Sequence, residues 1–178
     1  MKRLICLAVL CLIAPMGALA QDAATNPLSA TLSGILSRYS KNLIGTAEIM
    51  PASKYGYHPT PEEMTFAQAM AHIATVNNFS CGKLIEGPPA PGPKTTDKDS
   101  KEKLIEGLKA SLNYCTEAFS KLTDARLGDK VPFFGGRQVT RLGAALEVTH
   151  DLADHYASLA VYLRLNGLLP PTAQKKMK

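Results

Sequence analysis

The chain lacks the residues and motifs that indicate many common functions. It has no tryptophan, only 6% of its 178 residues are aromatic, and its formal net charge is only +5. It carries no Gly-x-Gly-x-x-Gly or Gly-x-x-x-x-Gly-Lys pattern for phosphate binding, and no nucleophile elbow or paired-acid signature. It also has no Cys-x-x-Cys pair, which argues against a thiol redox centre or a zinc ribbon.

The longest apolar run lies at the beginning of the chain. Lys2 and Arg3 precede an apolar segment from Leu4 to Ala14, and a small-residue exit follows at Ala18-Leu19-Ala20. This pattern is typical of a secretory signal peptide, and the run is shorter than the roughly 20 residues of a membrane-spanning helix. We expect cleavage near Ala20, a periplasmic or secreted protein, and no membrane span.

Residues 21–178 then make one domain of 158 residues, enough for a single core. This part holds 18 basic and 15 acidic residues, and its net charge of +3 is too small to indicate a nucleic-acid partner. The basic end, 175–178, is typical of a solvated tail.

Two cysteines, Cys81 and Cys115, remain after cleavage, in a compartment where disulfides persist. Their positions would suit one bridge between two antiparallel helices. Two buried free thiols are the alternative, because sequence does not report the short Cα separation that a disulfide requires.

Apolar residues at helical spacing predict four helices. The first covers about residues 29–50. The second begins after a Thr65 cap and ends near Gly87, and the third begins near Asp99 or Ser100 and buries residues as far as Leu122. The fourth runs from about Thr140 to Asn166.

The connections between these segments are rich in proline and glycine. Residues 87–98 contain four prolines and cannot continue a helix, and a second loop covers residues 124–138. Because no segment has a convincing period-2 alternation of a strand, the sequence predicts an all-α fold, a four-helix bundle.

Two histidines on different predicted helices are the best candidates for a site. His72 and His155 both have largely apolar neighbours at helical spacing, and Asp151 lies one turn before His155 on the same face. His150 is rotated by roughly 140° from His155 and lies on a wetter face. Two imidazoles and one carboxylate can hold a divalent metal. The alternative is a buried core His72 beside an ordinary Asp151–His155 surface pair.

Several segments, spread over essentially the whole of residues 21–178, together form the pattern of a known family. The segment from His155 to Pro171 is the most specific, and the run from Phe66 to Ala74 around His72 is moderately so. The most specific part contains Asp154-His155-Tyr156, Tyr162-Leu163-Arg164-Leu165-Asn166-Gly167 and Pro170-Pro171, and a further segment is Tyr57-His58-Pro59-Thr60-Pro61-Glu62. Together these segments resemble the DinB/YfiT-like superfamily.

The resemblance implies a four-helix bundle that binds a divalent metal, such as Zn, Ni, Mn or Fe. The ligands it implies are one histidine on the second helix and two at His-x-x-x-His spacing on a later helix. His72 and His155 match the first and last of these, but the middle position is Asp151. Three alternatives follow. The Asp151 carboxylate takes the place of the middle imidazole, or the helix is locally distorted so that His150 is the middle ligand, or metal binding has been lost. We favour Asp151.

The resemblance also implies a metal-dependent enzyme of the thiol-transferase or hydrolase kind. Candidates for a general base are Glu147, Asp154 and Tyr156, which lie near the predicted ligands in sequence. The alternative is a non-catalytic exported bundle that binds a small molecule or a metal. The sequence does not identify a substrate, and it leaves a homodimer through helix faces open.

Overall fold

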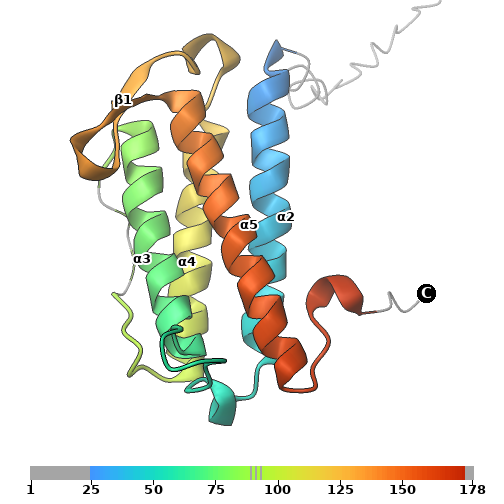
Figure 1. The fold of residues 1–178 in the computed structure, drawn as a ribbon. Helices are drawn as coiled ribbons and strands as arrows, with labels where there is room; N and C mark the ends of the chain where they lie inside the picture. The colour runs from blue at the N-terminus through green and yellow to red at the C-terminus, as the bar shows by residue number, and fades with distance from the viewer. Residues whose placement is uncertain (1–24, 89, 91, 93, 175–178) are drawn as a thin grey trace, which may run out of the picture.

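Four long helices form the protein in the computed structural model, which describes residues 25–88, 90, 92 and 94–174 (Figure 1). Their bounds are α2 Pro27–Ile49, α3 Phe66–Ile85, α4 Lys101–Ser120 and α5 Arg141–Leu165. The predicted all-α four-helix bundle is therefore confirmed. The predicted signal peptide, residues 1–20, and the basic end, 175–178, lie outside the described residues. No helix in the described part of the chain is long and apolar enough to cross a membrane.

Three of the helices begin where the sequence places a capping side chain. Thr65 and Gln68 form a reciprocal capping box at the start of α3, with N–O distances of 2.8 and 3.1 Å. Ser100 and Thr140 likewise accept a hydrogen bond from the third backbone amide of α4 and of α5. Each cap satisfies an amide that the helix cannot pair internally, so the local sequence sets these boundaries.

The start of α2 depends instead on a residue that is distant in sequence. Asp124, in the short 3-10 helix η2 (Asp124–Arg126), accepts hydrogen bonds from the backbone amides of Leu28 and Ser29 at 3.0 and 2.8 Å. Burial raises the pKa of Asp124, but these hydrogen bonds outweigh that effect and hold it below its ordinary value. The helix begins at Pro27, two residues earlier than predicted, because proline suits a first helical turn.

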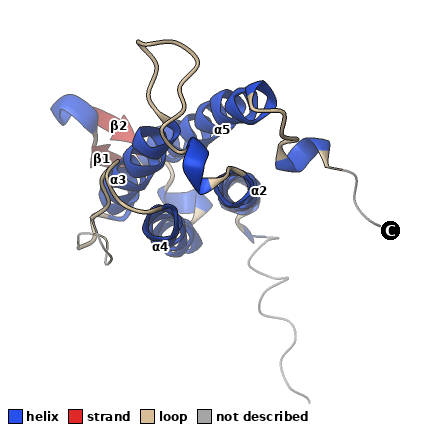
Figure 2. Cartoon of the chain, turned by 90° about the horizontal axis from the view of Figure 1, so that it is seen from below, coloured by secondary structure: helices blue, strands red, loops and turns tan. Residues whose placement is uncertain are grey.

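The helices form two parallel pairs of opposite direction. Figure 1 shows that α2 and α5 run one way while α3 and α4 run the other way. Each helix packs against two neighbours, in the cyclic order α2, α4, α3, α5, which the end-on view of Figure 2 displays. Consequently α3 and α5 are antiparallel neighbours, although α4 separates them in sequence.

The long proline-rich connection allows α3 and α4 to be parallel. It returns along α4: Tyr114 Oη donates to the Pro88 carbonyl at 2.6 Å, and Thr95 packs on Gly107, nearer the start of α4. A Cβ at Gly107 would lie 2.4 Å from Thr95 Cγ2, so a larger residue at this helical position would require the Thr95 side chain to move. A tight turn between the two helices would have forced an antiparallel pair.

Cys81 and Cys115 form a disulfide between α3 and α4, with a Cα–Cα distance of 5.2 Å. Both residues are fully buried, and both lie near the C-terminal ends of their helices. The expectation of an antiparallel helix pair around this bridge was wrong. Parallel helices bring equivalent ends together, and the long connection supplies that arrangement.

The loop after α4 contains two short strands that the sequence analysis did not predict. Strand β1 (Lys130–Pro132) pairs antiparallel with β2 (Gln138–Thr140), with Val131 opposite Val139. Three residues are too few to reveal a period-2 pattern. Between the strands lies the 3-10 turn η3 (Phe134–Gly136), where Gly135 and Gly136 take positive φ angles of 65° and 72°.

A buried arginine fixes the start of α5 against the end of α3. The Arg141 guanidinium, 5% exposed, donates to the Leu84 carbonyl and to Glu86 Oε2 at 2.9 Å. Its own backbone amide donates to the Asp129 carbonyl at 2.7 Å. Because the last carbonyls of a helix lack internal partners, this contact caps α3 and sets the register between α3 and α5.

Replacement of both bridged cysteines in a Cys81→Ala/Cys115→Ala variant should lower the free energy of unfolding by about 4 kcal/mol. The bridge spans 34 residues, and in the chain-entropy model it restricts the unfolded chain by that order. Urea unfolding followed by circular dichroism measures the change. A reductant should lower the midpoint of the wild type and leave that of the variant unchanged, whereas equal midpoints without reductant would contradict the prediction.

Candidate functional site

The two candidate histidines meet between α3 and α5. The ring centroids of His72 and His155 are 5.2 Å apart, and the ring planes are inclined at 68°. His72 lies in the first half of α3 and His155 in the second half of α5, so the antiparallel packing of these helices brings them together. Both side chains are half-buried, as their apolar neighbours in the sequence led us to expect.

Asp151 lies beside this pair on α5. Its Oδ1 is 3.6 Å from Nε2 of His155, one helical turn away, and the two side chains are 38% and 18% exposed. Burial lowers the pKa of His155; Asp151 opposes this effect and His72 adds to it, and the net pKa lies below the ordinary value. His155 is therefore neutral at pH 7, the form in which imidazole binds a metal.

The two imidazoles suit a divalent ion in type and in their mutual distance. Two imidazoles on one ion, with metal–nitrogen bonds of about 2.0–2.1 Å, hold their ring centroids roughly 5 Å apart, which is close to the separation of His72 and His155. However, within residues 25–88, 90, 92 and 94–174 no group of three or more His, Cys, Asp or Glu side chains is arranged as a formed metal site. A shared ion would require these side chains to turn toward a common centre.

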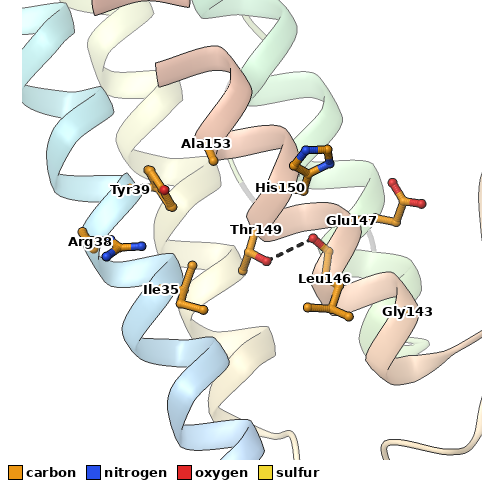
Figure 3. A pocket seen from close by; sticks show the side chains of 9 residues that line it. All are labelled: Ile35, Arg38, Tyr39, Gly143, Leu146, Glu147, Thr149, His150 and Ala153. Atoms are coloured by element: carbon orange, nitrogen blue, oxygen red, sulfur yellow. Dashed lines mark hydrogen bonds between the residues drawn. The ribbon is translucent and has the colours of Figure 1, made fainter. Parts of the chain in front are cut away.

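His150 lies on a different face of α5 from His155 and is exposed. It borders an open groove of about 570 Å³ between α2 and α5, opposite Arg38 and Tyr39 (Figure 3). The structure thus places Asp151, not His150, next to His155. This agrees with the wetter face that the sequence indicated for His150.

A cavity of about 270 Å³ adjoins the histidine pair on the side of the β1–β2 hairpin. Residues from α3, α5 and the hairpin line it, and it includes two of the three candidate metal ligands. The lining residues are His72, Val76, Asn77, Ser80, Phe133, Phe134, Glu147, Val148 and Asp151.

Six of these lining residues were not singled out from the sequence as site residues: Val76, Asn77, Ser80, Phe133, Phe134 and Val148. Asn77 reads as part of the buried stripe of its helix, and nothing in its spacing indicates that one side of it borders a cavity. The two phenylalanines stand before a Gly-Gly pair in a loop, a composition that suggests a tight turn but not where the loop packs. In the structure the turn carries Phe134 onto Phe79 of α3, with ring centroids 4.6 Å apart.

The three candidate general bases lie in different surroundings. Glu147 borders the cavity, and Figure 3 shows it on the edge of α5 away from Arg38 and Tyr39. The hydroxyl of Tyr156 is instead hydrogen-bonded to Thr172 Oγ1 at 2.6 Å, and its ring lies on the side of α5 that faces Tyr39 of α2. Asp154 is exposed and is not among the cavity residues. Glu147 is therefore the candidate that the structure places at the site.

Comparisons with known proteins agree with this architecture. The family model described as the DinB superfamily matches residues 36–159. Among solved structures, a DinB-like protein from Bacillus subtilis is 21% identical with a TM-score of 0.66, covering 83% of this chain and 99% of its own. A DinB-like protein from Bacillus cereus is 19% identical with a TM-score of 0.64, covering 78% and 94%. No curated protein matches the chain.

The free energy of unfolding should fall as the pH drops below about 6.5. Below that pH the His155 imidazole is protonated in the unfolded chain, whereas its lowered pKa in the folded protein opposes protonation. The folded-state pKa is the lower one, so the free energy of unfolding is greatest above that pH and declines below it. Urea unfolding between about pH 7 and pH 5.5, in the presence of a chelator, measures the slope.

The control for this pH dependence is the exposed neighbour His150. We expect His155→Gln to flatten the slope and His150→Gln to leave it unchanged. Identical slopes for the wild type and His155→Gln would show that His155 does not cause the dependence.

Proposed function

Because the chain belongs to the DinB superfamily and brings two imidazoles and a carboxylate together, we propose that it is an exported divalent-metal-binding bundle. The ion would be held by His72 from α3 and by Asp151 and His155 from α5. The single observation that carries this proposal is the contact between the two imidazoles, 5.2 Å apart between centroids, with a carboxylate one turn away.

The donor set favours a first-row transition metal such as Zn, Ni, Mn or Fe. Imidazole nitrogen suits these ions, and a carboxylate in place of a third imidazole adds one negative charge to the site. Three protein ligands leave positions open for water or substrate, and an ion held in this way lowers the pKa of a bound water.

Of the two reactions that the family resemblance implies, hydrolysis suits this chain better than thiol transfer. The disulfide between Cys81 and Cys115 would persist in an oxidising compartment, and such a compartment lacks a pool of reduced small thiols. Glu147, on the wall of the cavity, would serve as the carboxylate that accepts a proton.

Export is the second part of the proposal. Residues 1–20 have the pattern of a signal peptide, and the only cysteines among the described residues are bridged. We propose cleavage near Ala20 and a periplasmic or secreted location.

A second candidate function is a non-catalytic bundle that binds a small molecule. The observation that favours it is the cavity of about 270 Å³ with a buried polar floor, together with donors that form no ready-made metal site in the described residues. Metal binding decides between the two candidates, because the second one requires no ion.

Elemental analysis and metal titration of the purified protein test the metal site. We expect about one ion per chain in the wild type, and near-complete loss in His72→Ala and Asp151→Ala with unchanged helix content. Loss of a direct ligand should lower affinity by more than the roughly 10–100-fold that loss of an outer-shell partner costs.

The matched control is His150→Ala, on the same helix but on the exposed face. It should retain the metal. If it loses the metal while Asp151→Ala retains it, the assignment of Asp151 is wrong; if the wild type binds no ion, the non-catalytic function replaces the metal-binding one.

A further inference from the structure

The polar residues that line the cavity between α3, α5 and the hairpin are mostly hydrogen-bond acceptors, and the only basic side chain among its described lining residues is His72. Glu147 and Asp151 contribute two carboxylates, and neither lysine nor arginine is among its lining residues. An anionic ligand would meet repulsion here, whereas a cationic group would be attracted.

The floor of the cavity adds two buried polar groups. Asn77 is 1% exposed and donates from Nδ2 to Ser111 Oγ at 3.2 Å; the Ser111 hydroxyl in turn donates to the Leu108 carbonyl. Among the residues that the structure describes, none donates a hydrogen bond to Asn77 Oδ1. Ser80, 2% exposed, has no hydrogen-bond partner for its hydroxyl within the described residues. A ligand that donates hydrogen bonds would satisfy both groups.

The wall of the cavity offers aromatic faces. Phe133 is buried and Phe134 is 40% exposed, with ring centroids 4.8 Å apart. Phe134 stacks on Phe79. The Lys83 ammonium lies 5.5 Å from the centroid of the Phe79 ring. Phe79 and Lys83 are not among the lining residues, so within the cavity the faces of Phe133 and Phe134 are the ones that would attract an ammonium group.

From these surroundings we infer that the cavity binds a small organic cation: a protonated amine on an apolar or aromatic body. The ammonium group would face Glu147, Asp151 and Asn77 Oδ1, and the body would pack against Phe133 and Phe134. This goes beyond the proposed metal site and does not require an ion. His155 is a proposed metal ligand but not a lining residue of the cavity, so the two sites can be tested separately.

Calorimetric titration of the chelator-treated protein with three matched probes tests the charge of the ligand. The probes are phenethylamine, 2-phenylethanol and phenylacetate, which share the aromatic body and differ in the polar group. Phenethylamine should bind about tenfold more tightly than the alcohol, because charge-assisted hydrogen bonds exceed neutral ones, and phenylacetate should not bind. Equal binding of the amine and the alcohol, or no binding of the amine, would overturn the proposal.

Substitutions test the location. Glu147→Gln should weaken phenethylamine binding by about fivefold, a loss suited to a partly exposed charge, whereas Glu106→Gln, at an exposed position on α4, should not change it. Ser80→Leu should fill the floor and abolish binding, with circular dichroism to verify its fold. Unchanged binding in both Glu147→Gln and a folded Ser80→Leu would place the amine elsewhere.

His155→Ala separates this proposal from the proposed metal site. It should empty the metal site and retain measurable phenethylamine binding, because Glu147, Asn77 and the two phenylalanines of the cavity stay in place. A change of a few fold is expected, because His155 contacts Asp151, and residues in contact are coupled. A wild type that binds the amine but no ion would refute the metal site alone. Loss of amine binding in a folded His155→Ala would refute the cavity proposal alone.

Discussion

The antiparallel contact between α3 and α5 is the constraint on which the rest of this molecule depends. Its register is fixed at one end by Arg141, whose guanidinium caps the last turn of α3 while sitting at the first turn of α5. A buried guanidinium that lost these partners would be left uncompensated, which is costly. Because the register is fixed at that end, the positions further along the two helices are fixed with it, and His72 faces His155.

The other side of α3 is held just as firmly. The disulfide joins it to α4 near the C-terminal ends of both helices, and the returning connection packs along α4 as far as Gly107. A helix anchored on both sides loses little entropy when its side chains bind a ligand, which favours a preorganised site. The parallel direction of α3 and α4 brings their C-terminal ends to the same end of the bundle, so α5 begins there and runs antiparallel to α3.

The proposed metal ligands and the proposed ligand cavity occupy successive parts of the same contact between α3 and α5. The imidazole pair is desolvated enough to keep His155 neutral, and the adjoining cavity ends under the two phenylalanines of the hairpin turn. Asp151 and His72 belong to both parts. An ion held by these residues would offset the negative charge of the cavity, so metal and organic cation would influence each other through Asp151.

Local sequence determined the elements of this protein. The caps at Thr65, Ser100 and Thr140 and the apolar stripes fixed three helix starts, because capping and periodicity involve residues within one or two turns. Periodicity also indicated that His72 and His155 face apolar surroundings and that His150 faces water.

Only the tertiary structure decided how those elements face one another. Helix direction depends on where a long connection packs, so the parallel pairing around Cys81 and Cys115 was not visible in the sequence. The two short strands, the cap that Asp124 supplies to α2 and the cavity floor at Ser80 arise from contacts between residues far apart in the chain. Such contacts leave no periodic signal in the sequence, because packing between elements, and not local spacing, creates them.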